Sequence, residues 1–299
     1  MNIVVFGAGA IGSLFGGLLS QKNRVVLIGR KPHVHAIKTK GLSIEGKTQL
    51  KTAISAYDAV VSLPWSVDLL LLTVKSYDTL LAISQAKELI TEKTVVLSLQ
   101  NGLQNIERIQ DVVDHTQIVA GITTHGALFS KPGCISHTGY GTTVIGELDG
   151  SETSRVKKIQ TVFESAGIAT SVSSDIRKDI WSKAIINSCI NPVSAFLGCP
   201  NGYLLENPIL ENIIEIICKE STLIAQSCGI QLTYSDMVLK TKEVIEQTAE
   251  NYSSMLQSIS RGKKTEIEAI NGALVSLGKA YGIDISVNEL LVSLIKTSF

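Results

Sequence analysis

Lys183, Asn187 and Asn191 recur at every fourth position of a mostly apolar segment, Ile180–Val193. On a helix, these three side chains lie along one stripe. A buried amide without a partner would cost about 1–3 kcal/mol, so the stripe must face either water or a polar ligand. A cationic acid beside two amides that bind hydroxyl or carbonyl oxygens is suited to reducing or hydrating a small oxygenated molecule. The alternative is a solvated helix face.

The start of the chain carries a second motif with a chemical meaning. A short apolar strand, Asn2–Phe6, leads directly into Gly7-Ala8-Gly9-Ala10-Ile11-Gly12, and Ser13–Leu19 then reads as a helix. In this context the first glycine allows the tight turn, the second lets a pyrophosphate approach the backbone, and the third lets helix and strand pack closely. The helix N-terminus offers N–H groups to phosphates. We therefore expect dinucleotide binding; the alternative is a glycine-rich turn without a ligand.

The end of the second expected strand, Arg24–Ile28, indicates which dinucleotide. NAD-binding sites usually carry an acid here that holds the ribose 2′-hydroxyl. This chain has no acid between the strand and Lys31, and it carries Arg30 and Lys31 instead. A guanidinium pairs with a 2′-phosphate, so NADP(H) is favoured over NAD. Lys75 follows the expected strand Leu69–Val74 and is either a further cofactor contact or a surface lysine.

Length and composition set outer limits. The 299 residues suit two domains, and 44% hydrophobic residues allow a sizeable core. A net charge of zero offers no basic field for nucleic acid or a membrane surface, and no apolar run reaches the roughly 18 residues of a membrane span. No metal-ligand cluster appears. The five scattered cysteines indicate a reduced, cytoplasmic protein; they are Cys134, Cys189, Cys199, Cys218 and Cys228.

Up to about residue 172, strand-like runs alternate with helical ones, which predicts an open α/β sheet. The expected strands are Ile3–Phe6, Arg24–Ile28, Leu69–Val74, Thr94–Leu99, Ile118–Ile122, Cys134–His137, Thr143–Ile145 and Ile168–Val172.

After Asp175 the chain reads as almost wholly helical. We therefore expect an α/β Rossmann-type dinucleotide-binding domain over residues 1–174 and an all-α domain over residues 175–299, with the active site in the cleft between them. The expected helices are Ile176–Leu197, Asn207–Gly229, Tyr234–Ser260, Thr265–Gly282 and a short one from Asn288.

Three polar residues outside the stripe are further candidates. Asn101 follows a strand; it either caps a helix beginning near Leu103 or binds the nicotinamide or its ribose. Asn201 lies in the turn Cys199–Gly202 and is either a turn residue or a ligand contact. Glu266 falls in the first turn of a helix opened by Thr265, where a dipole-favoured acid is the simpler interpretation.

That helix is also expected to begin with a capping box, because Thr265 and Glu268 have the required spacing. All five histidines precede the helical part, so Lys183 is the best candidate for a proton donor. Desolvation would lower the pKa of its amine toward the working range, and a nearby carboxylate such as Glu266 would partly oppose that fall.

Taken together, these motifs resemble the ketopantoate reductase (2-dehydropantoate 2-reductase) family from end to end. The matching segments are Gly7–Gly12, Arg30, Val74-Lys75, Gln100-Asn101-Gly102, Thr123–Ala127, Trp181-x-Lys183-x3-Asn187-x3-Asn191-Pro192, Cys199–Gly202, Ser253–Gln257, Thr265–Ile267 and Ile270–Gly272.

The resemblance implies reduction of 2-dehydropantoate to (R)-pantoate by NADPH, on the route to pantothenate and coenzyme A. It assigns proton donation to Lys183, and to Glu266 the binding of the substrate hydroxyl and the holding of lysine and cofactor. The remaining implied contacts are Asn187, Asn191, Asn201, Asn251 and Ser254 for substrate, and Gly7, Ala8, Gly9, Ala10, Ile11, Gly12, Arg30, Lys75, Asn101 and Ala127 for the cofactor.

Alternatives to this function stay open. One is reduction of another branched 2-oxo acid, because a family resemblance does not fix the side-chain pocket. The other is a non-catalytic NADPH-binding sensor. A homodimer formed through the helical part is a further hypothesis.

Overall fold

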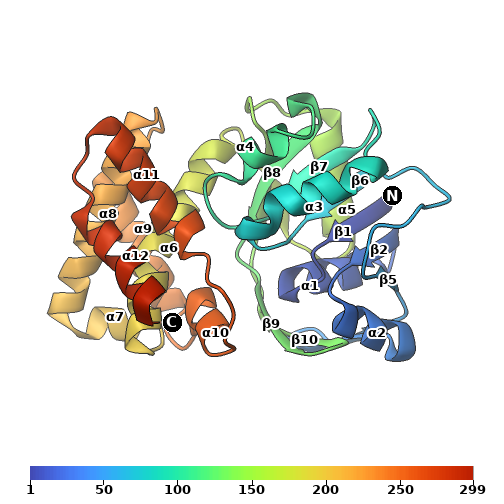
Figure 1. The fold of residues 1–299 in the computed structure, drawn as a ribbon, viewed down its shortest axis with the longest axis horizontal. Helices are drawn as coiled ribbons and strands as arrows, with labels where there is room; N and C mark the ends of the chain where they lie inside the picture. The colour runs from blue at the N-terminus through green and yellow to red at the C-terminus, as the bar shows by residue number, and fades with distance from the viewer. Residues whose placement is uncertain (299) are drawn as a thin grey trace. The chain divides into compact units, whose positions relative to one another are not determined.

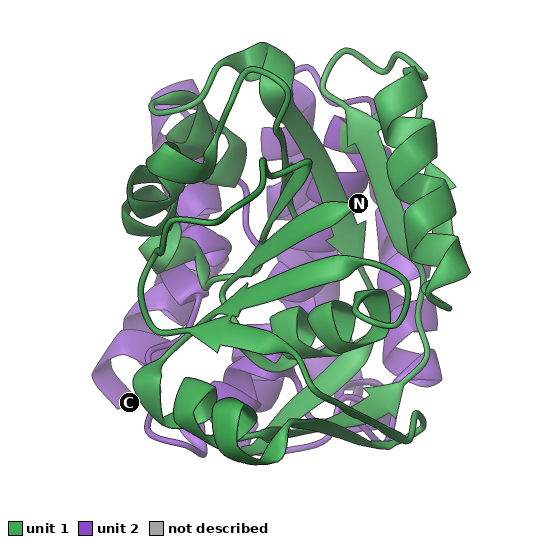
Figure 2. Cartoon of the chain, turned by 90° about the vertical axis from the view of Figure 1, so that its right-hand side faces the viewer, with its two compact units in different colours: residues 1–100, 105–176 green, residues 101–104, 177–299 purple. Residues whose placement is uncertain are grey.

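A computed structural model describes residues 1–298 and shows two compact units. The first comprises residues 1–100 and 105–176, and the second comprises residues 101–104 with the chain from 177 onward (Figure 2). The first unit is α/β and the second is helical, as predicted (Figure 1). The short loop 101–104, which follows a strand of the first unit, belongs to the second.

The main sheet of the first unit has eight strands in the order β12-β11-β8-β7-β6-β1-β2-β5. Its strands are parallel except that β11 and β12 run opposite to the others. The bounds are β1 (Asn2–Phe6), β2 (Arg24–Ile28), β5 (Ser55–Tyr57), β6 (Leu69–Leu72), β7 (Val95–Ser98), β8 (Ile118–Thr123), β11 (Thr143–Glu147) and β12 (Thr170–Val172).

A second sheet of four strands corrects the expectation of a single sheet. Its order is β4-β3-β10-β9, so the predicted strand Cys134–His137 lies here rather than in the main sheet. Strands β3, β4, β5 and β9 were not predicted, because they are short or only partly buried and show no sustained apolar run. The bounds are β3 (Leu42–Gly46), β4 (Leu50–Thr52), β9 (Gly126–Lys131) and β10 (Cys134–Gly139).

Successive side chains of the buried strands point to opposite faces of the main sheet, so a hydrophobic core forms on each face. Ile3 and Val5 of β1 belong to one buried cluster, and Val4 and Phe6 belong to the other. Helices α1 and α5 supply side chains to the first cluster, and α3 and α4 to the second. The bounds are α1 (Ala10–Leu19), α2 (Lys31–Lys40), α3 (Thr79–Ala86), α4 (Asn105–Gln110) and α5 (Ser154–Ser165), with 3-10 turns η1 (Ser76–Asp78), η2 (Lys87–Leu89) and η3 (His115–Gln117).

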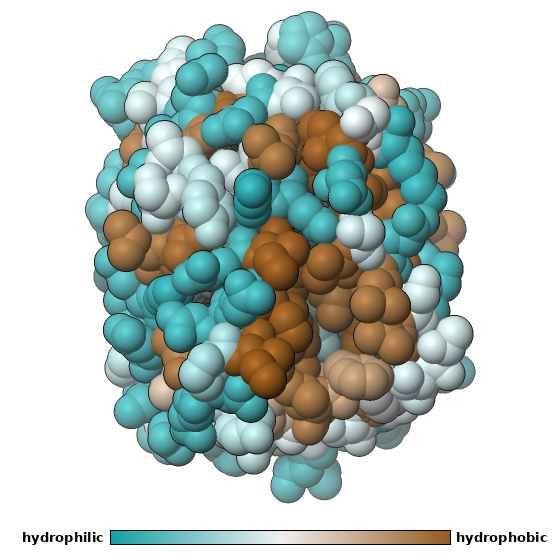
Figure 3. All heavy atoms as spheres, turned by 90° about the vertical axis from the view of Figure 1, so that its left-hand side faces the viewer, coloured by the Kyte–Doolittle hydropathy of each residue, from teal (hydrophilic) through white to brown (hydrophobic). Residues whose placement is uncertain are grey.

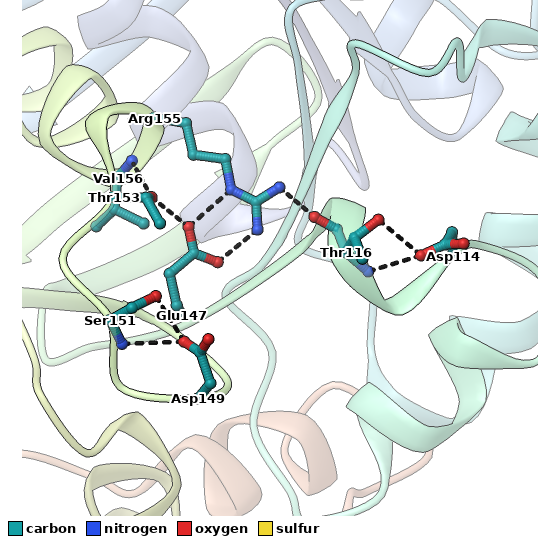
Figure 4. A network of polar contacts seen from close by, with 8 residues as sticks. All are labelled: Asp114, Thr116, Glu147, Asp149, Ser151, Thr153, Arg155 and Val156. Atoms are coloured by element: carbon teal, nitrogen blue, oxygen red, sulfur yellow. Dashed lines mark hydrogen bonds and ion pairs between the residues drawn. The ribbon is translucent and has the colours of Figure 1, made fainter.

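A network of charged hydrogen bonds connects the end of strand β11 in the main sheet to the start of helix α5 and to the turn η3 (Figure 4). The Glu147 carboxylate, at the end of β11, accepts hydrogen bonds from Arg155 and Thr153 at the start of α5. Arg155 also donates to the Thr116 carbonyl in η3. The carboxylate is almost fully buried, so its two-point pairing with a guanidinium offsets the cost of removing it from water.

His33 joins the main sheet's helices to the second sheet. Its Nδ1 accepts the backbone N–H of Gly133 at 2.9 Å, so Nε2 carries the proton and donates to Ser13 Oγ at 2.9 Å. The imidazole is buried, and this burial lowers its pKa to about 4. The folded protein therefore holds His33 neutral, whereas the unfolded chain protonates it near pH 6.5.

We expect the free energy of unfolding to fall as pH drops from about 6.5 to about 4, by an amount on the order of 2–3 kcal/mol from His33. Urea unfolding of the wild type and His33→Gln at pH 7.5 and 4.5 measures this effect. The variant should lose part of the acid sensitivity, whereas His35→Gln, an exposed histidine of the same helix, should retain it. Equal acid sensitivity in all three proteins would contradict the assignment.

The helical unit differs from the predicted segments most strongly at two places. The helix expected over 234–260 is two helices, because Thr248 ends the first and Ser253 Oγ caps the second by accepting from Leu256 N at 3.3 Å. The helix expected from Thr265 begins only at Asn271, after a 3-10 turn. In addition, the short helix at Tyr203–Glu206 was not predicted, and the last helix begins at Ser286 rather than at Asn288. The bounds are α6 (Ile176–Leu197), α7 (Tyr203–Glu206), α8 (Pro208–Ser227), α9 (Tyr234–Gln247), α10 (Ser254–Ile259), η4 (Ile267–Ala269), α11 (Asn271–Tyr281) and α12 (Ser286–Ser298).

Among residues 1–298, none of the helices has the length and apolar character required to cross a bilayer.

Candidate active site

The three glycines of the turn after β1 differ in their surroundings. Two of them lie tightly against other protein atoms, whereas the third faces open space. Gly7 has φ +111°, and a Cβ there would lie 2.5 Å from Val74 N. A Cβ on Gly12 would lie 2.2 Å from the Gly7 carbonyl oxygen. By contrast, a Cβ on Gly9 would have a single protein neighbour, at 3.9 Å. The protein's own packing does not require glycine at position 9, so the turn fits a group that approaches from outside, as a pyrophosphate does.

The helix after this turn begins at Ala10, three residues earlier than expected, so Gly12 lies inside α1. Gly9 is its N-cap and provides no side-chain hydrogen bond, which leaves N–H groups of the first turn for a ligand. Ala8 is buried, and Ala10 and Ile11 are partly buried. This arrangement of backbone donors fits the phosphates of a dinucleotide.

Arg30 is highly exposed and lies at the N-cap of α2, directly after the Gly29 that follows β2. Its guanidinium approaches the Asp78 carboxylate at 3.8 Å. Asp78 belongs to η1, which Lys75 precedes as N-cap after the neighbouring strand β6. The two candidate cations thus follow the strands on either side of β1, and Asp78 adds an acid beside Arg30 that the segment between β2 and Lys31 does not contain.

Ala127 lies on β9 of the second sheet, opposite His137 of β10, and is partly buried against the core cluster that includes α1. The structure therefore places this candidate on a different sheet from the strand ends that carry the other cofactor candidates of the first unit. Two further buried groups lie nearby in sequence: His125 Nδ1 is 3.3 Å from His137 Nε2.

The lysine–asparagine stripe forms on α6 as expected. Lys183 is partly buried, and desolvation lowers the pKa of its amine to about 8, although the charge of Glu266 acts in the opposite direction. Asn191 is buried and Asn187 is partly buried, and neither side-chain amide donates to or accepts from another group in residues 1–298. The stripe therefore combines an easily deprotonated ammonium with amides that have unused hydrogen-bonding capacity.

Asn201 is held in place by the loop that follows α9. Its backbone N–H donates to the Asn251 carbonyl at 2.9 Å, and its Nδ2 donates to Thr248 Oγ1 at 2.9 Å. Its Oδ1 is buried and lacks a hydrogen-bond partner within the described residues. This oxygen is thus an acceptor without a donor, as expected of a group that meets a ligand hydroxyl.

The same loop lies against the C-terminal part of α6 through a residue that was not among the predicted substrate contacts. Ser253 is buried, and its hydroxyl accepts from Ser194 Oγ at 2.8 Å and approaches the Asn191 carbonyl at 3.5 Å. The two predicted substrate contacts of this loop, Asn251 and Ser254, are both exposed. Asn251 was predicted inside a long helix but precedes α10, so its backbone is available to hold Asn201.

Asn101 does not cap a helix at Leu103, because α4 begins at Asn105. Instead its loop lies against η4 of the helical unit: Leu103 N donates to the Ala269 carbonyl at 3.2 Å. Gly102, with φ +97°, permits this approach, since a Cβ there would lie 2.7 Å from the same carbonyl oxygen. Asn101 is therefore brought close to the segment that begins with Glu266.

Glu266 is buried at the N-cap of η4 and not in the first turn of a helix. The capping box expected here is absent: Thr265 Oγ1 accepts from Ile267 N at 3.4 Å, while Glu268 is exposed and pairs with Lys296 at 2.5 Å. The simpler interpretation of Glu266 as a helix-start acid therefore fails. Glu266 is instead a buried carboxylate whose charge raises the pKa of Lys183.

Fold and glycine turn together define a Rossmann-type dinucleotide-binding protein whose helical unit carries a lysine–carboxylate pair. Sequence profiles of Ketopantoate reductase PanE/ApbA match residues 3–150, and those of its C-terminal region match residues 175–298. The chain belongs to the ketopantoate reductase family, which confirms the resemblance read from its motifs.

Relatives and solved structures cover almost the whole chain. The 2-dehydropantoate 2-reductase of Pyrococcus abyssi is 42% identical over 99% of this chain and 97% of its own length. The PanE/ApbA family ketopantoate reductase of Ralstonia eutropha is 30% identical with a TM-score of 0.89, over 99% and 98% of the two chains. A D-mandelate dehydrogenase solved with NADH and anilino(oxo)acetate is 27% identical with a TM-score of 0.94, again over 99% and 98%.

Proposed function

We propose that this protein reduces 2-dehydropantoate to (R)-pantoate with NADPH, in pantothenate and coenzyme A biosynthesis. The observation that carries the proposal is Lys183, a lysine whose pKa is lowered to about 8 beside the buried Glu266 and two available amides. The relatives named 2-dehydropantoate 2-reductase, at 42% identity over 99% of this chain, supply the substrate.

In this proposal, residues 1–174 bind the cofactor and residues 175–299 bind the substrate and perform the chemistry. The glycine turn holds the pyrophosphate, Arg30 and Lys75 hold the 2′-phosphate, and Asn101 and Ala127 line the nicotinamide side. NADPH, when bound, supplies the hydride that reduces the ketone. The open space at Gly9 and the exposed guanidinium of Arg30 fit that group.

Lys183 holds the proton that the carbonyl oxygen takes up. Its ammonium stabilises negative charge developing on that oxygen and then donates the proton. Burial weakens the hold of the amine on its proton, and Glu266 limits this effect, so the acid form still predominates below pH 8. Asn187, Asn191 and Asn201 bind substrate oxygens, Glu266 binds the substrate hydroxyl, and Asn251 and Ser254 lie near its carboxylate.

The test follows NADPH absorbance with purified protein and 2-dehydropantoate, with NADH in parallel. Fast oxidation of NADPH alone supports the reaction and the role of Arg30. Equal rates with NADH would still support the proposed reaction but would contradict the preference for NADPH. NADPH binding without oxidation would contradict the proposed reaction and would favour the alternative of a non-catalytic NADPH-binding sensor.

A second candidate is reduction of a different 2-oxo acid, with NADH acceptable as donor. Two observations favour it: the TM-score of 0.94 to a D-mandelate dehydrogenase solved with NADH, and Asp78 at 3.8 Å from Arg30. An acid at this place can bind a ribose 2′-hydroxyl. Relative kcat/KM for 2-dehydropantoate and phenylglyoxylate, each with both cofactors, separates the two candidates.

A homodimer is part of the proposal, and so is a cytoplasmic location, which the scattered cysteines support. Exposed apolar side chains recur every seven residues along α8, at Ile209, Ile216 and Leu223, and apolar side chains gather on the corresponding face of the helical unit (Figure 3). Identical stripes of two copies can interdigitate about a two-fold axis. Leu239 of α9 is also exposed, and a stable interface buries roughly 800 Å² per partner.

Light scattering is expected to give the mass of two chains for the wild type and of one chain for Ile216→Glu. Burying a glutamate against an apolar partner stripe removes more affinity than such an interface provides. Leu290→Glu, an exposed leucine on α12, is the matched control and should remain dimeric. A monomeric wild type would refute the dimer.

A further inference from the structure

Helix α6 contains a proline between the polar stripe and its C-terminal end. Pro192 has no N–H, so the carbonyl four residues earlier, that of Ser188, loses its helical hydrogen-bond donor. The gap lies in the turn between Asn187 and Asn191, within the stripe that the proposed function uses. A buried carbonyl left without a donor would be costly, and kinks form where this ladder is interrupted.

The missing donor is supplied from another helix. Asn271, the first residue of α11, is fully buried, and its Nδ2 donates to the Ser188 carbonyl at 3.1 Å. The second hydrogen of the same nitrogen goes to Asn288 Oδ1 at 3.0 Å. Both donor positions of this amide are therefore used, and its Oδ1 has no partner within the described residues.

A buried carboxylate fixes which way these amides face. Glu220 of α8 accepts from Asn288 Nδ2 at 2.7 Å and from the backbone N–H groups of Val287 and Asn288, each at 3.0 Å. An ionised carboxylate only accepts, so Asn288 must present its nitrogen to Glu220 and its oxygen to Asn271. Asn271 must then present its nitrogen, which is the orientation that serves Ser188.

Asn271 also lies at the end of the segment that carries Glu266. The Glu266 carbonyl accepts from Ala269 N at 3.0 Å and from Ile270 N at 3.2 Å, so a compact turn leads directly to Asn271. One buried amide thus links the break in α6 to the segment that positions the carboxylate.

We propose that Asn271 is a positioning residue for the reaction: its amide replaces the backbone donor that Pro192 lacks and so fixes the turn of α6 that carries the polar stripe. The inference rests on the proposed function for its kinetic readout. The network Ser188–Asn271–Asn288–Glu220 holds the amine and amides of α6 at a set distance from Glu266.

The experiment is a double-variant cycle of Asn271→Ala and Pro192→Ala. Asn271→Ala alone should lower kcat about 10–100-fold with a smaller change in KM, because binding groups remain while the acid is misplaced. Alanine at 192 restores an N–H to the helix. In the Pro192→Ala background the kcat loss from Asn271→Ala should therefore be at least about tenfold smaller. Equal losses in both backgrounds would overturn the proposal.

Ser221→Ala is the matched control. Ser221 is fully buried, and its hydroxyl lies 3.2 Å from Ser188 Oγ, so the change removes a buried contact to the same residue without touching its carbonyl. It should lower Tm and leave kcat and its pH profile unchanged. A fall in kcat like that of Asn271→Ala would mean that any loss of buried contacts here suffices, which contradicts positioning by the amide.

Two further measurements distinguish failure of this inference from misfolding of the variant and from failure of the proposed reaction. If Asn271→Ala does not fold, a folded double variant supports the proposal and an unfolded one contradicts it. If the wild type binds NADPH without turning over 2-dehydropantoate, the proposed reaction fails. The titration of Lys183, followed by NMR of the isotopically methylated lysine, must then shift in Asn271→Ala and recover in the double variant.

Discussion

Lys183→Ala is expected to lower kcat by about 10³-fold or more while the Kd for NADPH stays nearly unchanged. The substitution removes both the charge that stabilises the developing alkoxide and the proton donor, and each effect is worth about 10²-fold or more. NADPH binding should be preserved because the glycine turn and Arg30 belong to the other unit. Stopped-flow turnover and fluorescence titration measure the two quantities.

The dependence of kcat on pH tests whether the loss of activity in Lys183→Ala is due to this amine. Since the pKa of Lys183 is lowered to about 8, its acid form decreases above that pH, and kcat should fall about tenfold per pH unit there. Glu266 raises this pKa, so Glu266→Gln should move the alkaline limb to lower pH. Arg177→Ala, an exposed cation of the same helix, is the control and should keep the wild-type profile. Near-normal activity of Lys183→Ala would show that another group is the acid.

The sequence predicted the elements whose patterns are local and strong. The span Ile176–Leu197 matches α6 residue for residue, and Arg24–Ile28 matches β2, because long periodic segments and buried parallel strands leave clear signals. Strands β3, β4 and β9 gave no such signal, because they are short or only partly buried. Strands β4 and β9 pair with their neighbours in sequence, whereas the pairing of β3 with β10, which joins the two hairpins into one sheet, spans about ninety residues. A strand stabilised by tertiary contacts leaves little local trace.

The candidate site shows the same difference between features with a local sequence signal and features that depend on tertiary contacts. The stripe of Lys183 and the two asparagines follows from helical periodicity alone, and the structure forms it on α6. The capping box at Thr265 was wrong because local propensity was overridden: Glu268 pairs with Lys296 of α12 instead. Asp78 beside Arg30 was missed because it comes from another strand end, and strand order cannot be read from a single segment.

Gly9→Ala is expected to weaken NADPH binding with little change in Tm, whereas Gly12→Ala should lower Tm. The backbone of Gly9 has φ −84°, which alanine adopts without strain, and a Cβ there would have only one protein neighbour, at 3.9 Å. That Cβ would occupy the space through which a pyrophosphate reaches the backbone. An overpacking cost of about 1–3 kcal/mol corresponds to a Kd roughly 5–150-fold higher.

Gly12→Ala provides the matched comparison, because the same methyl group then meets the protein itself. Its Cβ would lie 2.2 Å from the Gly7 carbonyl oxygen and 2.4 Å from Thr73 Oγ1, so α1 must move away from the strand. Fluorescence titration with NADPH and thermal unfolding of both variants decide the matter. Wild-type NADPH affinity in Gly9→Ala would show that no ligand approaches this backbone, and the space at Gly9 would then say nothing about a cofactor. Loss of affinity at unchanged Tm requires a group outside the protein, since nothing inside it is displaced.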